Sequence, residues 1–168
     1  MPEDVDASPL FPAPENLMQF EADPRFQVLV GSTEGETILS TNNKMPPLDD
    51  VRVRKAIAHA IDRQAIIDGA MFGFGTPIGT HFAPHNPDYL DLTGNSAHDP
   101  AMAKALLAEA GYPEGFTTTL KLPPPSYARR GGEIIAAQLR AVGITVEISN
   151  LEWAQWLEQV FRGKDYGL

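Results

Sequence analysis

The sequence contains no cysteine, which excludes disulfide bonds, thiolate metal ligands and cysteine nucleophiles together. It has no apolar run approaching the ~20 residues that a membrane-spanning helix needs. Basic residues are few: 13 lysines and arginines stand against 22 acidic residues, for a formal net charge of −9. Such a chain lacks the positive field that attracts nucleic acid or anionic lipid, so we expect neither as a partner and no membrane insertion.

A secretory signal is also missing, because residues 1–4 carry no basic region followed by an apolar one. We therefore expect either a cytoplasmic chain or an excised piece of a larger secreted protein. The hydrophobic content of 43% and the charged content of 21% are typical of a globular protein. A length of 168 residues is sufficient for a real core, so we expect residues 1–168 to form a single domain.

No catalytic arrangement is evident. The serines are isolated from any His-x-Asp pattern, and no Gly-x-Ser-x-Gly motif occurs. Carboxylates are plentiful, but sequence alone cannot bring a pair of them together. We therefore expect no enzyme activity and no cofactor, and a hydrolase is the least favoured hypothesis.

Two motifs resemble ligand-binding motifs, but neither lies in the secondary structure that binding would require. His81 and His85 have a spacing that would aim two imidazoles at one metal on a helix, yet Pro84 and Pro87 disfavour a helix there. We expect solvated loop histidines and no metal site. The Gly-x-Gly of residues 73–75 follows a helix rather than a strand, so it predicts a surface loop and not a phosphate cradle.

The clearest element is a helix that starts near Asp49, which can cap its first turn. Leu48 precedes the cap and can pack on Val53, while apolar residues recur at helical spacing as far as Ile61. Asp62 is expected to cap a second helix over residues 63–71.

The rest of the chain predicts an α/β fold, with a small mixed sheet flanked by helices. Further helices are expected over residues 15–21, 100–110, 128–142 and 153–162, and strands over residues 26–30, 37–41, 116–122, 144–148 and 165–168. The first two strands suggest a hairpin. The strand–helix–strand order over 116–148 predicts a βαβ unit with parallel strands and a right-handed crossover. We expect Trp153 and Trp156 to pack in the core rather than to form a ligand platform.

The candidate binding residues lie where the strand over 116–122 leads into the next helix. Ligands bind at this edge of open α/β sheets, and the free N–H groups of a first helical turn attract anions. Arg129 and Arg130 stand at this helix start although the helix dipole disfavours cations there. A bound carboxylate would remove that conflict, so the candidate ligand-binding residues are Ser126, Tyr127, Arg129 and Arg130.

The run from Asn43 to Arg63, with its Pro-Pro-x-Asp-Asp-Val-Arg-Val-Arg core, resembles the extracellular solute-binding proteins of peptide and nickel ABC importers, family 5. The likeness continues at Asp99-Pro100 through Pro113, from Gly143 to Glu147, and at Glu152-Trp153. It therefore covers nearly the whole chain.

This resemblance implies one lobe, the second, of a two-lobed periplasmic binding protein. Such a protein captures a peptide-like ligand between its lobes and delivers it to an ABC permease. The resemblance implies that Ala128-Arg129-Arg130 faces the cleft, and it places the first lobe before Met1 and the return crossover past Leu168. The ligand stays open among di- or oligopeptides, opines, sugars and metal chelates. The alternative function is a stand-alone protein-interaction domain that docks a partner through residues 69–95.

Overall fold

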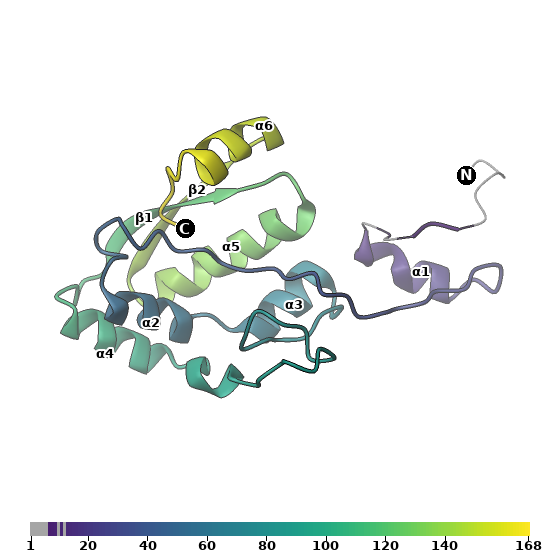
Figure 1. Ribbon diagram of the computed structural model, residues 1–168, viewed down its shortest axis with the longest axis horizontal. Coiled ribbons are helices and arrows are strands. Elements are labelled where there is room, and N and C mark those ends of the chain that lie inside the picture. Colours follow the sequence, from purple (N-terminus) through teal and green to yellow (C-terminus); the bar gives the residue numbers. More distant parts are fainter. Residues whose placement is uncertain (1–6, 10, 12) are drawn as a thin grey trace.

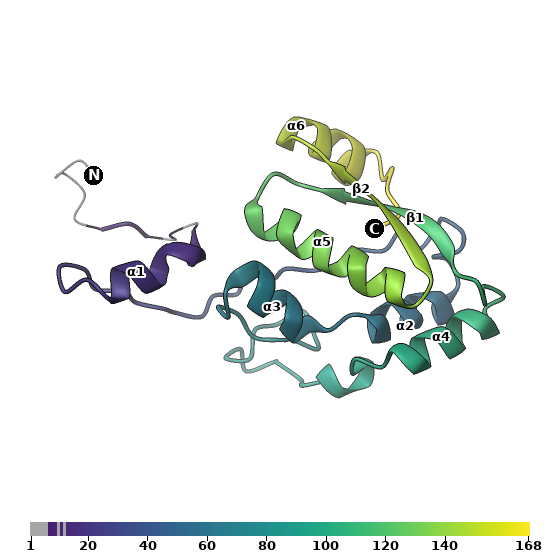
Figure 2. The ribbon, with the colours of Figure 1, turned by 180° about the vertical axis from the view of Figure 1, so that it is seen from behind.

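The computed structural model describes residues 7–9, 11 and 13–168. Its centre is a pair of strands, β1 (Phe116–Leu122) and β2 (Ile144–Asn150), which are joined through helix α5 (Ser126–Ala141). Figure 1 shows α5 on one face of the strands. Beyond α5 lie α2 (Val51–Ala60) and α3 (Arg63–Met71), and α4 (Pro100–Glu109) lies against the far side of α2. Helix α6 (Trp153–Trp156) lies on the opposite face, and the view from behind in Figure 2 shows the same layers.

The remaining helical pieces are short. A 3-10 turn, η1 (Pro14–Asn16), leads into α1 (Leu17–Glu21), which lies at one end of the molecule (Figure 1). A second 3-10 turn, η2 (Thr93–Ser96), precedes α4, and a π-helical segment, η3 (Leu157–Arg162), continues α6. We call residues 11 and 13–25 the N-terminal arm. The helix expected over 15–21 is confirmed within it.

The βαβ unit is confirmed, and with it the α/β class. Strands β1 and β2 pair in parallel, from Phe116 opposite Ile144 to Leu122 opposite Asn150. The turn into β1 approaches the end of α5 so closely that a Cβ on Gly115 would lie 1.8 Å from the Gly143 oxygen. Only glycine fits at position 115, where φ is +80°.

The predicted hairpin is wrong. Residues 26–30 and 37–41 form no strand, and Leu29 is 83% exposed. Their β-branched and aromatic residues favour an extended backbone, but a strand also needs a partner for its N–H and C=O groups. In the part of the chain that the structure describes, the sheet is therefore parallel rather than mixed.

The strand expected over 165–168 is present only as a backbone pairing. The Leu168 N–H donates to the Thr119 oxygen at 2.9 Å, and the Leu168 oxygen accepts from the Lys121 N–H at 3.1 Å. This alternation is the pattern of a parallel neighbour to β1. The Leu168 side chain is buried in the core.

The helix starts follow the carboxylates that cap them. Asp62 caps α3 and Asp99 caps α4, each by accepting a hydrogen bond from a first-turn N–H group, as expected. The cap of α2 is Asp50, which accepts from the Arg52 N–H at 2.8 Å, so the expectation of Asp49 was one residue early. Leu48 and Val53 nonetheless share the core.

The core lies between the sheet, α5, α2 and α4. Leu139 on α5 is fully buried, in one cluster with Leu120 of β1 and Ile144 of β2. α5 begins two residues earlier than the expected start at 128, because Pro125 can precede a helix but not lie inside one. Over the described residues, no helix is both long enough and apolar enough to span a membrane.

The expectation that the tryptophans pack in the core is not met for Trp153, which is 50% exposed. Trp153 and Trp156 contact each other edge to face, with ring centroids 5.9 Å apart. Leu157 and Phe161 are exposed beside them. The helix predicted from the spacing of these apolar residues is confirmed. However, α6 and η3 lie on the outer face of the sheet, where no described segment covers these side chains.

Candidate ligand-binding site

The start of α5 combines a free helix terminus with the end of a strand. β1 ends at Leu122, and after the three prolines that follow, α5 begins at Ser126. Pro125 precedes the helix and supplies no side-chain cap, so the first N–H groups are left for another acceptor. This is the strand-to-helix edge at which α/β proteins bind ligands.

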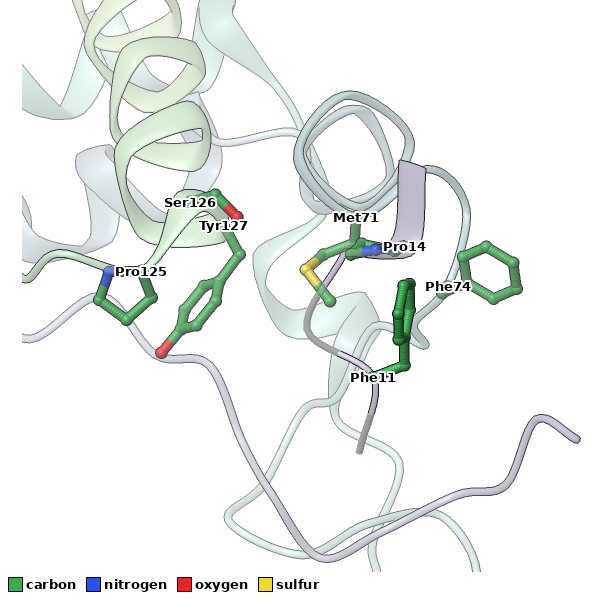
Figure 3. A pocket seen from close by; sticks show the side chains of 7 residues that line it. All are labelled: Phe11, Pro14, Met71, Phe74, Pro125, Ser126 and Tyr127. Atoms are coloured by element: carbon green, nitrogen blue, oxygen red, sulfur yellow. The ribbon is translucent and has the colours of Figure 1, made fainter. Parts of the chain in front are cut away.

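A pocket of about 470 Å³ opens at this point, between the helix start, the end of α3 and the N-terminal arm (Figure 3). We call it the α5 pocket. Its lining residues are Phe11, Pro14, Met71, Phe74, Pro125, Ser126 and Tyr127. Two of the four candidate binding residues, Ser126 and Tyr127, therefore line it. The walls are mostly apolar and aromatic, as in most small-molecule sites.

Arg130 lies beside the α5 pocket and already holds a carboxylate. Its two terminal nitrogens donate to the two carboxylate oxygens of Glu15, at 3.1 and 3.3 Å. The guanidinium also lies over the Phe72 ring, 5.2 Å from its centroid. These hydrogen bonds hold the pKa of Glu15 below its usual value and raise the pKa of Arg130. Arg130 thus has the fork geometry for carboxylate recognition.

Arg129 points elsewhere. One terminal nitrogen reaches the exposed carboxylate of Glu152 at 3.4 Å, a long contact for an ion pair. Its Nε is buried and has no acceptor among the described residues. Neighbouring residues on a helix project about 100° apart, which separates the two guanidiniums. The two guanidiniums therefore have different carboxylate partners, and the expectation that Arg129 or Arg130 holds a ligand anion stays a prediction.

The other lining residues were not foreseen. Phe11 and Pro14 come from the N-terminal arm, while Met71 and Phe74 follow from the end of α3. Figure 3 shows Met71 between Tyr127 and Phe11. No local pattern in the sequence links these segments, which are about 50 to 115 residues apart from one another along the chain. The usable signal was the apolar, aromatic character of residues 71–74.

His81 and His85 each pair with a carboxylate. His81 Nδ1 lies 2.9 Å from a Glu36 oxygen, and His85 Nε2 lies 2.8 Å from a Glu34 oxygen. No group of three or more potential metal ligands occurs within the described residues. These pairs join the extended segment before α2 to the loop after α3.

The Glu15–Arg130 pair predicts a pH dependence. Because the pKa of Glu15 is lowered in the folded chain, the pair stabilises the arm above the unfolded value of about 4.3. That contribution is lost as the pH falls through the lowered folded pKa. A carbon-detected NMR titration should therefore give Glu15 a lower pKa in the wild type than in Arg130→Ala. Identical values in both proteins would contradict the pairing.

The structure is an α/β domain with an apolar pocket and two arginines at the start of one helix. The chain belongs to the bacterial extracellular solute-binding proteins, family 5, because the model of the middle part of that family matches residues 3–167. It is 32% identical to heme-binding protein A of Haemophilus influenzae over 160 residues, which are 92% of this chain and 29% of that protein. It is 31% identical to the dipeptide-binding protein of Escherichia coli over 159 residues, 92% of this chain and 30% of that protein.

A solved structure supports the same family. The periplasmic binding protein DppA of Helicobacter pylori, associated with an ABC transporter and solved with the peptide STSA, superposes with a TM-score of 0.77 at 29% identity. The match covers 92% of this chain and 30% of that protein. The chain thus spans less than a third of the length of these relatives. The family consists of solute-binding proteins, as its name states.

Proposed function

We propose that residues 1–168 form one folding unit that corresponds to the second lobe of a periplasmic solute-binding protein. That protein captures a peptide-like ligand between two lobes and delivers it to an ABC permease. Membership of family 5 supports the binding role, and relatives named for dipeptide binding and for a bound peptide support the ligand class. The comparisons give no support to a stand-alone interaction domain or to a hydrolase.

The observation that carries the proposal is the two-point contact between Arg130 and Glu15, which follows the pocket-lining Pro14 in the chain. A peptide ends in a carboxylate of the same geometry as the Glu15 side chain. The ligand carboxylate would displace Glu15 from the guanidinium and lie near the free N–H groups at the start of α5. Ser126 and Tyr127 would contact the ligand from the pocket wall.

Arg129 is the second candidate anchor. Its Nε is a buried donor without an acceptor among the described residues, and such a donor costs free energy until a partner meets it. Its contact with Glu152 is long and exposed, so little would be lost if a ligand replaced it. The two arginines can be distinguished because each has its own carboxylate partner.

Glu15→Gln tests Arg130 directly. The Glu15 carboxylate must leave the guanidinium before a ligand carboxylate can bind there, so removing this competitor should tighten dipeptide binding about two- to fivefold if Arg130 holds the ligand carboxylate. Chemical-shift titration of the 168-residue chain with Ala-Phe measures the affinity. Glu21→Gln, in the same arm but with no ion pair among the described residues, is the matched control. Unchanged affinity in Glu15→Gln would leave Arg129 as the anchor.

The 168-residue chain by itself should bind peptides more weakly than micromolar. One lobe leaves half of the ligand in water and lacks the contacts of the second wall, while the cost of immobilising the ligand is unchanged. Calorimetry with di- and tripeptides measures this affinity. Submicromolar binding would refute the proposal that the site is shared between two lobes.

A further inference from the structure

We propose that the α5 pocket receives a bulky apolar side chain, aromatic or long aliphatic, from the same ligand residue that carries the carboxylate. This inference rests on the proposed function, because it assumes that an α5 arginine holds that carboxylate. It adds the substrate class: peptides, or similar acids, with a large apolar residue at the carboxylate end.

The chemistry of the lining supports this occupant. Phe11, Met71, Phe74 and Tyr127 present rings and a thioether, and among the described residues no carboxylate, ammonium or guanidinium lines the pocket. A polar side chain that entered would lose water without gaining a partner, which is unfavourable. Aromatic rings offer edge and face contacts, and methionine adapts its shape to different apolar groups. The pocket therefore favours phenylalanine, leucine or methionine over aspartate or alanine.

The position of the pocket decides which ligand residue enters it. Ser126, in the wall, and Arg130 are four residues apart on α5 and so lie on one face of the helix, about 6 Å apart along its axis. On the opposite wall, Pro14 lines the pocket and its neighbour Glu15 contacts Arg130. In an amino acid, the carboxylate and the side chain leave the same carbon atom, which matches this short separation. A side chain further along a peptide would lie too far from the guanidinium.

Methionine methyl groups provide a direct test in the 168-residue chain. With ¹³C-methyl methionine, Ala-Phe at tens of millimolar should shift the Met71 signal by its ring current. The exposed Met18, Met45 and Met102, which do not line the pocket, should stay unchanged. Ala-Phe should bind at least about tenfold tighter than Ala-Ala or Ala-Asp, because only the first buries a large apolar group. A static Met71 signal would overturn the inference.

Two variants and one modified ligand distinguish a failure of the pocket assignment from a failure of the carboxylate site. Phe74→Ala and Tyr127→Ala should each reduce the preference for Ala-Phe over Ala-Ala, whereas Phe82→Ala, at a half-exposed phenylalanine of the same loop that does not line the pocket, should preserve it. Ala-Phe amide should bind more weakly than Ala-Phe. Loss on amidation without any side-chain preference overturns the pocket assignment and keeps the carboxylate site. Equal binding of acid and amide overturns the carboxylate site of the proposed function.

Discussion

Leu139→Ala should lower the free energy of unfolding by about 2–5 kcal/mol, the usual cost of truncating a leucine in a closed core. Leu139 is 0% exposed and shares its cluster with side chains from both strands and from α2. The neighbours can only partly close the space that the substitution leaves. Urea unfolding followed by circular dichroism measures the change.

The matched control for this substitution is Leu29→Ala, which removes the same atoms from a side chain that is 83% exposed. Its effect should stay within about 0.5 kcal/mol. The comparison also tests the proposal that the 168 residues form one folding unit, since a single cooperative transition is expected in all three proteins. Equal effects of the two substitutions, or a transition without cooperativity, would contradict the assignment of the core.

In the proposed two-lobed protein, replacing the anchoring arginine by alanine should weaken peptide binding roughly 10- to 150-fold. This range corresponds to a hydrogen bond to a charged group, about 1.5–3 kcal/mol. Arg→Lys at the same position should restore only part of the affinity, because an ammonium cannot make two parallel contacts with one carboxylate. Calorimetry on Arg129→Ala and Arg130→Ala determines which of the two arginines holds the ligand carboxylate.

Ligand amidation turns that comparison into a double cycle. Removing the carboxylate should cost the wild type far more than the variant that has already lost its anchor. Arg130→Ala carries an additional effect, since it also removes the ion-pair partner of Glu15, whose neighbour Pro14 lines the pocket. Equal losses from amidation in the wild type and in both variants would mean that neither arginine contacts the carboxylate.

Local sequence signals were sufficient to predict a helix start where a single side chain can cap the free N–H groups of the first turn. The start of α3 was predicted to the residue, because Asp62 is the only capping side chain directly before it. The start of α2 was misplaced by one residue, because Asp49 and Asp50 are chemically equivalent caps and only packing selects between them. The parallel pairing of β1 and β2 could be foreseen because a helix of this length must reverse the chain between them.

The candidate site was foreseen only in part. Ser126, Tyr127 and the two arginines were identified because a helix start after a strand is a general anion site. The sequence did not indicate that Arg129 and Arg130 have different carboxylate partners, because each partner is far away along the chain. The apolar half of the pocket was missed for the same reason.

The sequence by itself determined the capped helices, the βαβ unit and the family, since these depend on caps, alternation and ordered motifs within short stretches. Tertiary structure decided which extended segments find a partner: residues 26–30 and 37–41 find none, while Leu168 pairs with β1. It also decided that Trp153 is exposed and that Phe11, Met71 and Tyr127 meet at one pocket. Hydrogen-bond pairing and burial depend on which distant segments come together, and no local pattern carries that information.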